Sequence, residues 1–193
     1  MSSTLYVMSR SPRSNWLGAL VETLKLDIKV VDFANNSDFE KEFPLKKVPA
    51  LVESDGFELT EVIAIVEYLI SISDNEIISG KSIKDKAQVL RWLSFINSDL
   101  TTAWGKVIFV AKTDDEKKSA IQSVSNLLKY IDNQLSKRPF LAVDYSTVAD
   151  DFLFSWYAAL SSIVPITETE FPHLSKWHSV LKENDPVAKI LSK

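Results

Sequence analysis

The segment Phe43–Ile70, FPLKKVPALVESDGFELTEVIAIVEYLI, decides the fold that we predict for this chain. The apolar run Ala50–Val52 predicts a short strand, Ser54-Asp55-Gly56 has turn chemistry, and Phe57–Leu59 predicts a second strand. A helix is expected to start at Thr60, with Thr60 as its N-cap. The segment therefore predicts a β-hairpin followed directly by a helix.

Pro49 determines how this segment meets its neighbours. Proline cannot donate to a strand ladder, so a Val-Pro pair directly before an apolar strand belongs at the first residue of that strand, and a cis peptide bond is expected there. A cis-proline turns the N–H and C=O of Val48 outward, where they can pair with a peptide-like ligand. The first turn of the following helix offers N–H groups to an anion.

Length and composition indicate a globular protein. The chain has 193 residues, of which 46% are hydrophobic, including ten Phe and five Trp. This length predicts either one compact unit or two small packed lobes. The sequence has no Cys, which excludes a disulfide framework, a thiol nucleophile and a thiolate metal site. It also fits a reducing compartment.

The charge balance argues against a nucleic-acid-binding surface. There are 26 acidic and 22 basic residues, which give a net charge of −4. We find no apolar run of the roughly 18 to 20 residues that a membrane span needs, and no basic segment followed by an apolar core at the N-terminus. The sequence therefore predicts a cytoplasmic protein with neither direct nucleic-acid nor membrane contact.

The N-terminal half alternates between strand and helix patterns. Thr4–Met8 predicts a strand with Leu5 and Val7 on one face, and apolar residues at helical spacing predict a helix from about Arg13 to Lys25. Ile28–Phe33 predicts a second strand. Together with the later hairpin and helix, this order predicts a thioredoxin-like βαβ-ββα lobe over residues 1–73. The polar segment Asn35–Lys47 is expected to be a loop with a short, weak helix around Asp38–Glu42.

The C-terminal half has helical periodicity throughout. Ser73–Lys81 has turn chemistry and forms the predicted boundary, so an all-helical lobe is expected over residues 82–193. One helix is predicted from about Ile83 to Trp104, and another from about Asp114 to Leu135. The apolar stripe expected on the first of these consists of Val89, Leu90, Leu93, Ile96, Leu100 and Trp104.

A capping motif precedes the most apolar helix of this half. Thr147 is a good N-cap, and Asp150, three residues later, can bond back to the Thr147 N–H. Phe152–Ile163 is almost entirely apolar, which predicts a helix buried on most sides. Pro172 stands at a tolerated first-turn position of a further helix.

These motifs resemble the glutathione transferase superfamily. Val48-Pro49-Ala50-Leu51, Leu59-Thr60-Glu61 and the Thr147-x-x-Asp150 motif carry the resemblance, which covers essentially the whole chain. Leu5-Tyr6, Ser11-Pro12-Arg13, Phe43-Pro44-Leu45-Lys46-Lys47 and Leu90-Arg91-Trp92-Leu93-Ser94-Phe95 are further similar to the N-terminal domain of the gamma subunit of the fungal elongation factor 1 complex. The resemblance implies the glutathione transferase fold.

The resemblance also implies a glutathione site at residues 47–49 and 61–62. In the family an acidic residue followed by a hydroxyl residue holds the γ-glutamyl end of glutathione; Glu61 matches the first, but Val62 stands where the hydroxyl is expected. Alternatively, Glu61 only complements the helix dipole. Lys46, Lys47 or Arg13 could reach the glycyl carboxylate; alternatively, the lysines are solvated loop charges and Arg13 pairs within the fold.

The family activates the glutathione thiol by a hydrogen bond from a Ser or Tyr after the first strand. Ser9 and Ser11 are the candidates for this catalytic role, and Tyr6 lies one step earlier in the strand. Ordinary turn chemistry also explains a Ser before Pro. His173 and His178 are five residues apart and do not share a helix face, so no metal site is expected. A Ser-His-Asp triad and a phosphate-binding loop lack the required glycine patterns.

The leading functional hypothesis is a non-catalytic interaction module. A gamma-type subunit would help assemble the guanine-nucleotide-exchange complex of translation, with the exchange-factor subunit and elongation factor 1 alpha as partners. Such subunits carry a further C-terminal domain, so we expect either part of a longer protein or a shorter relative. The alternatives are an active glutathione transferase that uses Ser9 or Ser11, and an appendage of a tRNA-synthetase assembly. A homodimer is expected by analogy. No cofactor is expected, and the resemblance makes glutathione a possible ligand or substrate.

Overall fold

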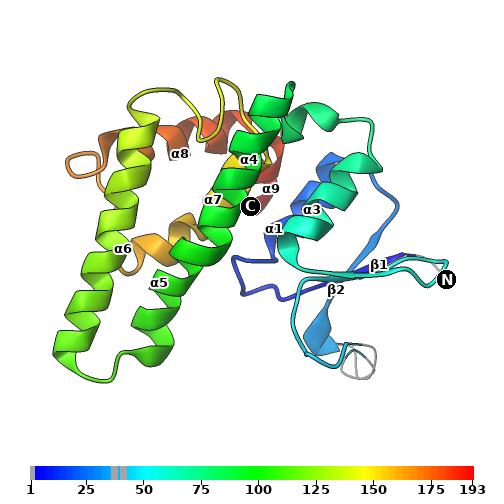
Figure 1. Ribbon diagram of the computed structural model, residues 1–193, viewed down its shortest axis with the longest axis horizontal. Coiled ribbons are helices and arrows are strands. Elements are labelled where there is room, and N and C mark those ends of the chain that lie inside the picture. Colours follow the sequence, from blue (N-terminus) through cyan, green and yellow to red (C-terminus); the bar gives the residue numbers. More distant parts are fainter. Residues whose placement is uncertain (1–2, 36–38, 40–42) are drawn as a thin grey trace.

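A four-stranded sheet with its helices lies beside a larger group of helices in the computed structural model (Figure 1). The structure describes residues 3–35, 39 and 43–193. The predicted fold class, a thioredoxin-like βαβ-ββα lobe followed by an all-helical lobe, is confirmed. The boundary that the sequence predicts between residues 1–73 and 82–193 stays a prediction.

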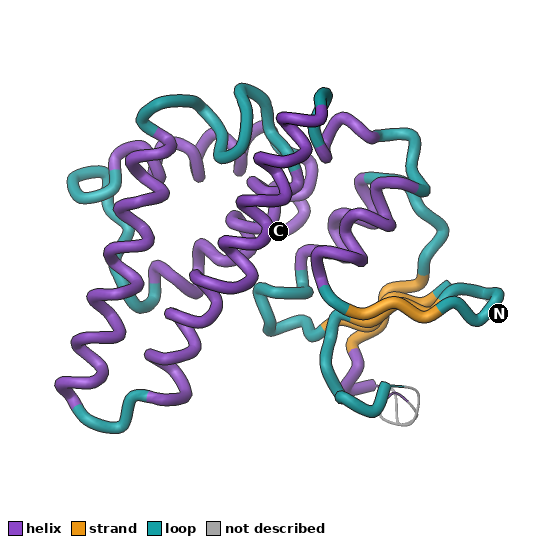
Figure 2. Tube along the Cα trace, viewed as in Figure 1, coloured by secondary structure: helices purple, strands orange, loops and turns teal. Residues whose placement is uncertain are grey.

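The sheet is mixed and has the strand order β2-β1-β3-β4 (Figure 2). Its strands are β1 (Thr4–Val7), β2 (Lys29–Asp32), β3 (Ala50–Val52) and β4 (Glu58–Thr60). β1 pairs with β2 in parallel and with β3 in antiparallel orientation, and β3 and β4 form the predicted hairpin. Gly56 has a φ of 90° in the hairpin turn, and the Asp55 side chain accepts a hydrogen bond of 2.9 Å from the Phe57 N–H.

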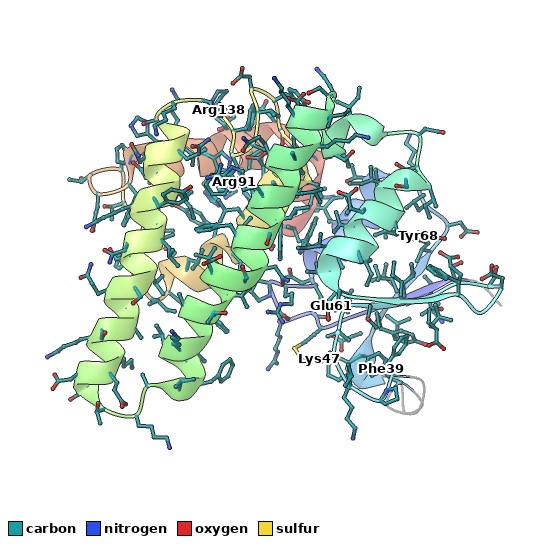
Figure 3. All side chains as sticks on the ribbon, viewed as in Figure 1. Phe39, Lys47, Glu61, Tyr68, Arg91 and Arg138 are labelled. Carbon is teal, nitrogen blue, oxygen red and sulfur yellow. The ribbon has the colours of Figure 1, made fainter. Side chains whose placement is uncertain are left out.

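Different groups of residues pack on the two faces of the sheet. Leu5 and Val7 face α1 (Trp16–Thr23) and α3 (Val62–Ser71) in the main core. Tyr6, on the opposite face, packs in a small cluster with Phe39, Phe43 and Ala50. Figure 3 shows Phe39 on the side of the sheet away from these helices. The alternation of β1 side chains is therefore the one that its sequence predicts.

The second lobe is built from helices of unequal length. A long helical segment consists of α4 (Ile83–Phe95), the π-helical turn Ile96–Leu100, α5 (Thr101–Gly105) and a second π-helical turn, Lys106–Val110. It is followed by α6 (Asp114–Leu135), α7 (Val148–Ser161), α8 (Pro172–Asn184) and α9 (Pro186–Leu191). Short 3-10 turns occur at Phe33–Asn35 and Glu76–Ser79.

Several predicted boundaries differ from the structure. The first helix starts at Trp16 rather than Arg13, because turns occupy the residues before it. Thr60 is not an N-cap: it pairs with Ala50 as the last residue of β4, and Glu61 precedes the helix. The long helix continues past Trp104 to Val110. The expected weak helix over 38–42 lies outside the described residues except for residue 39.

The predicted stripe of the long helix also needs correction at one position. Val89, Leu93, Ile96 and Leu100 are buried, but Leu90 is 41% exposed. Successive residues on a helix are 100° apart, so a side chain next to the centre of the stripe turns away from the core. Trp92, which the predicted stripe omits, is 1% exposed and packs in the core in place of Leu90.

The Asp150 carboxylate joins three segments of the helical lobe. Its Oδ1 accepts hydrogen bonds from the Leu141 N–H at 3.0 Å and the Trp177 indole N–H at 2.9 Å. Its Oδ2 accepts from the Thr147 N–H at 3.0 Å and the Thr147 hydroxyl at 3.2 Å, so the predicted bond back to the N-cap is present. Burial raises the pKa of Asp150 to about 6, against the opposing effect of these four hydrogen bonds.

A second buried carboxyl group follows directly. Asp151 is 5% exposed and shares a hydrogen bond with Asp185. Asp185 accepts from the Val187 and Ala188 N–H groups at 2.9 and 3.1 Å and from the Ser146 hydroxyl at 3.0 Å. Burial and then the Asp185 charge raise the pKa of Asp151 well above its usual value. Asp151 therefore carries the proton of the pair.

The two lobes share one hydrophobic core. Trp16 of α1 stacks on Phe152 of α7, with ring centroids 5.2 Å apart and planes at 23°. The Ser155 hydroxyl donates to the Pro12 carbonyl at 2.7 Å, which ties α7 to the loop after β1. Within the described residues, no helix has the length and apolar character needed to cross a membrane.

We expect Asp150→Ala to lower the free energy of unfolding by at least about 3 kcal/mol, because it leaves buried N–H donors without acceptors. Chemical denaturation monitored by circular dichroism measures this loss. Asp144→Ala, at an exposed position in the same segment, is the control and should change stability by less than about 0.5 kcal/mol. A loss below about 1 kcal/mol for Asp150→Ala would contradict the role assigned to this carboxylate.

We expect Asp151→Asn to stabilise the protein at pH 7.5 and to have little effect at pH 4. An Asp whose pKa is raised on folding contributes stability that is present below its unfolded pKa and is lost as the pH rises. Asn keeps a donor for Asp185 and does not titrate. Urea unfolding of both proteins at the two pH values tests this; a variant less stable than the parent at pH 7.5 would refute it.

Candidate functional site

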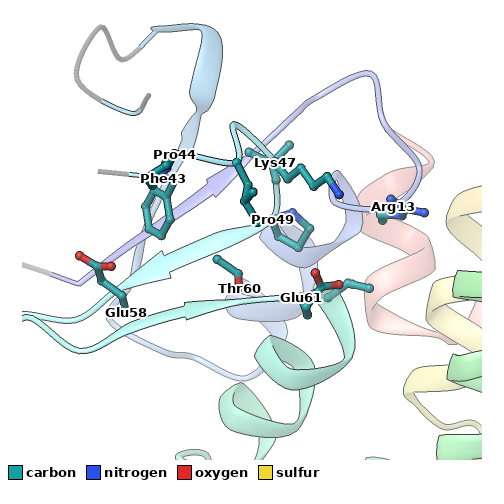
Figure 4. A pocket seen from close by; sticks show the side chains of 11 residues that line it. Arg13, Phe43, Pro44, Lys47, Pro49, Glu58, Thr60 and Glu61 are labelled. Atoms are coloured by element: carbon teal, nitrogen blue, oxygen red, sulfur yellow. The ribbon is translucent and has the colours of Figure 1, made fainter. Parts of the chain in front are cut away.

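A cavity of about 320 Å³ lies along the hairpin and the start of α3 (Figure 4). Residues from four segments line it: the loop before α1, the loop before β3, strand β4, and the β4–α3 junction. The lining residues are Arg13, Phe43, Pro44, Leu45, Lys47, Val48, Pro49, Glu58, Thr60, Glu61 and Val62. Five of these are the predicted glutathione-site residues Lys47, Val48, Pro49, Glu61 and Val62.

The loop before β3 supplies a backbone edge to this cavity. The Val48–Pro49 peptide bond is cis, as the sequence predicts. Pairing between β1 and β3 ends at Ala50, so Val48 lies beyond the paired residues and lines the cavity. Pro49 is largely buried and also lines the cavity.

Glu61 connects β4 to α3 in an unusual backbone conformation. Its φ is 71° and its ψ is 122°, a region that side-chain-bearing residues rarely adopt. Such a conformation costs about 1–3 kcal/mol and persists where the surrounding structure determines it. Here Thr60 is held in the sheet while the Glu61 carbonyl accepts the Ile65 N–H of α3 at 3.0 Å. The strained residue therefore stands at the cavity wall with its side chain exposed.

Val62 is the first residue of α3 and is 2% exposed. Its side chain belongs to the main core and also forms part of the cavity wall. N–H groups at the start of a helix have no intrahelical partner and can bind an anion. A ligand carboxylate at this wall could therefore use backbone N–H groups, without help from a hydroxyl at this position.

Opposite charges gather at one end of the cavity. Figure 4 shows the side chains of Lys47, Arg13 and Glu61 at this end, whereas Glu58 lies at the other end near Phe43. The Arg13 Nε is buried and has no hydrogen-bond partner among the described residues. This arrangement suits a small ligand that carries charges of both signs.

The serines proposed for catalysis do not line this cavity. The Ser9 N–H donates to Asp32 Oδ2 at 2.9 Å, and the Ser9 hydroxyl donates to the same oxygen. These hydrogen bonds lower the pKa of Asp32. The Ser11 N–H donates to the Met8 carbonyl at 2.9 Å, within the turn after β1. Both serines are thus placed in turn structure, the alternative that sequence analysis leaves open.

Tyr6 belongs to the small cluster on the far face of the sheet. Its ring centroid lies 5.1 Å from that of Phe39 and 6.0 Å from that of Phe43. Lys46 has a φ of 52° and is absent from the cavity wall, which Lys47 joins. Of the residues between β1 and α1, Arg13 is the one that lines the cavity.

Sequence reasoning missed five lining residues as members of the site. Glu58 and Thr60 lie two apart on β4, so the two-residue period of a strand places both on one face. The sequence does not reveal this strand face, because Thr60 also fits the start of a helix. Phe43, Pro44 and Leu45 form the apolar wall, and Leu45 is 76% exposed.

Family models match most of the chain. The model of the glutathione S-transferase N-terminal domain matches residues 1–71, and that of the glutathione S-transferase C-terminal domain matches residues 86–184. This chain belongs to the glutathione transferase family. The resemblance predicted from sequence is therefore confirmed, including the similarity to elongation factor 1-gamma.

Relatives of this glutathione transferase family member include glutathione S-transferases and elongation factor 1-gamma proteins. It is 37% identical over 189 residues to glutathione S-transferase Y-2 of Pichia kudriavzevii, covering 97% of both chains. It is 31% identical over 197 residues to elongation factor 1-gamma 2 of Saccharomyces cerevisiae, covering 96% of this chain but 47% of that protein. The chain thus spans about half the length of that elongation factor subunit.

Solved structures of both kinds of relative match this chain. A crystal structure of a glutathione S-transferase from Pichia kudriavzevii matches with a TM-score of 0.83 and 38% identity, over 98% of this chain and 96% of that one. The GST-like domain of elongation factor 1-gamma from Saccharomyces cerevisiae matches with a TM-score of 0.82 and 28% identity, over 100% and 93%.

Proposed function

We propose that this protein binds glutathione in the cavity along the hairpin and acts as a glutathione transferase. The observation that carries the proposal is the gathering of Lys47, Arg13 and Glu61 beside the Val48 backbone in one cavity. Glutathione is a tripeptide with two carboxylates and one ammonium group. A peptide edge with nearby charges of both signs complements it.

Each end of the ligand has a matching group in the cavity. The Glu61 carboxylate pairs with the γ-glutamyl ammonium, and backbone N–H groups at the start of α3, near Val62, donate to the adjacent carboxylate. Lys47 pairs with the glycyl carboxylate. The Val48 backbone is the edge against which the central cysteinyl residue pairs.

Arg13 is the residue that stabilises the glutathione thiolate, a role for which the sequence offers Ser9 and Ser11 as candidates. It lines the cavity, its Nε is buried without a partner among the described atoms, and neither serine lines that cavity. A guanidinium near a thiol favours the thiolate and lowers its pKa. The thiolate then attacks an electrophile and forms a thioether as the leaving group departs. Similarity to glutathione S-transferase Y-2 over 97% of both chains supports this activity.

We expect Val62→Thr to tighten glutathione binding roughly 10-fold or more. Thr has nearly the shape of Val and adds a hydroxyl that can donate to the γ-glutamyl carboxylate, and a hydrogen bond to a charged group is worth roughly 1.5–3 kcal/mol. Isothermal titration calorimetry measures the change, with Val62→Ile as the apolar control. Equal affinity of the parent and the Thr variant would show that the γ-glutamyl group binds elsewhere.

We expect Glu61→Gln to weaken glutathione binding by about 10- to 150-fold, because the ligand ammonium loses its charged partner. Glu22→Gln, at an exposed position on α1, is the control and should bind like the parent protein. If Glu61→Gln binds glutathione as tightly as the parent in the same calorimetric titration, Glu61 does not pair with the ligand ammonium and only complements the helix dipole.

We expect Arg13→Ala to raise the pKa of the bound glutathione thiol and to lower turnover of a chromogenic electrophile at least about 10-fold. Titration of the thiolate absorbance in the binary complex measures the pKa. Ser9→Ala and Ser11→Ala serve as the comparison and should retain most of the activity. Loss of turnover in either serine variant, with Arg13→Ala unaffected, would reverse these assignments.

A second candidate function is a scaffold of the elongation factor 1 complex in the cytoplasm. Two observations favour it: the 31% identity to elongation factor 1-gamma 2 and the absence of Ser9 and Ser11 from the cavity wall. The exchange-factor subunit and elongation factor 1 alpha would then be partners. Capture of the purified exchange subunit by this chain, at a stoichiometry that size-exclusion chromatography confirms, would support the scaffold; no complex at micromolar concentration would oppose it.

A further inference from the structure

The cavity along the hairpin extends beyond the groups that the proposed function assigns to glutathione. Glu61, Val48 and Lys47 account for the γ-glutamyl end, the cysteinyl residue and the glycyl end of the tripeptide. At the other end of the same cavity, Glu58 lies near Phe43 (Figure 4). This part of the cavity wall is therefore left for a ligand longer than glutathione.

Strand pairing determines the direction in which the Glu58 side chain points. Glu58 of β4 pairs with Val52 of β3, and directly opposite residues of paired strands project to the same face of a sheet. Val52 packs against the small cluster that contains Phe43. The Glu58 carboxylate is therefore held on the face of the hairpin that forms the cavity wall.

The Glu58 carboxylate offers a negative charge to a ligand at this end. Its side chain is exposed, and within residues 3–35, 39 and 43–193 it makes no hydrogen bond or ion pair. The side chains of Lys47 and Arg13 lie at the opposite end of the cavity (Figure 4). An ammonium group is the ligand group that complements a carboxylate in this position.

An apolar path connects the glycyl position to Glu58. The loop before β3 runs from Phe43 through Pro44 and Leu45 to Lys47, and these four residues line the cavity. In the proposed binding mode the tripeptide ends beside Lys47, so a chain attached to its glycyl end continues along this loop toward Phe43. Apolar side chains along the path favour a chain of methylene groups.

We propose that this cavity binds glutathione amides in which the glycyl carboxyl group carries an alkylamine chain, as in a monoamide of a diamine. This ammonium subsite rests on the proposed glutathione site. The γ-glutamyl and cysteinyl groups bind as in glutathione, and Lys47 donates to the amide carbonyl oxygen that replaces the glycyl carboxylate. The methylene chain packs along Pro44 and Leu45, and its terminal ammonium group pairs with Glu58.

Isothermal titration calorimetry of the full chain with glutathione, its N-pentyl amide and its putrescine monoamide tests the ammonium subsite. The two amides have chains of equal length that end in a methyl or an ammonium group, and both lack the glycyl carboxylate. We expect the putrescine monoamide to bind at least about 3-fold more tightly than the pentyl amide. Equal affinity of the two amides, or tighter binding of the pentyl amide, would overturn the proposal.

Two charge variants test the partner of the ammonium group. Glu58→Gln should remove the preference for the putrescine monoamide, so that the two amides bind equally. Asp27→Asn removes the same charge at an exposed position outside the cavity and should retain the preference. High salt should reduce the preference in the parent protein, because the ion pair is open to solvent. A preference that survives Glu58→Gln would place the ammonium group elsewhere and overturn the proposal.

A third variant tests the path of the methylene chain. Leu45→Ser should weaken both amides relative to glutathione at least about 2-fold, because their chains lose an apolar contact. An unchanged ratio of amide to glutathione affinity would show that the chain does not follow this loop and would count against the subsite.

The same titrations separate the ammonium subsite from the glutathione site. Binding of glutathione without a preference between the two amides would overturn the subsite and leave the glutathione site intact. Absence of binding by all three ligands at millimolar concentration would refute the glutathione site and the subsite with it.

Discussion

The buried Asp150 carboxylate is the interaction on which the arrangement of the helical lobe depends. Its four hydrogen bonds come from the loop at Leu141, the N-cap Thr147 and the Trp177 indole, so it fixes the start of α7 relative to α8. α7 in turn bonds to the Pro12 carbonyl through Ser155. The position of Arg13 in the other lobe thus depends on a helix that starts at a buried charge.

The cavity along the hairpin lies beside a residue with an unusual backbone conformation. β4 is extended up to Thr60, and α3 begins at Val62, so one residue makes the whole change of direction. Glu61 makes it at a φ of 71°, which a glycine would adopt more easily. Backbone stability therefore does not favour a glutamate at this position.

The sequence predicts most of the fold because its signals are local. Alternation in β1, the Asp55-Gly56 turn and the Thr147-x-x-Asp150 motif each determine structure within a few residues. The beginning of α3 could not be predicted, because tertiary pairing of Thr60 with Ala50 outweighs its capping preference. The exclusion of Ser9 from the site is likewise non-local, since it depends on Asp32 in another strand.

The stacking of Trp16 on Phe152 limits how this protein can diverge from its relatives. Trp16 packs in the core of the first lobe, and its ring stacks on the Phe152 ring of the second lobe, with the ring centroids 5.2 Å apart. A chimera that joined the first half of this chain to the second half of a distant relative would place a mismatched surface against α1. A partner for the first lobe must therefore supply an aromatic ring at the position of Phe152 to restore the stacking on Trp16.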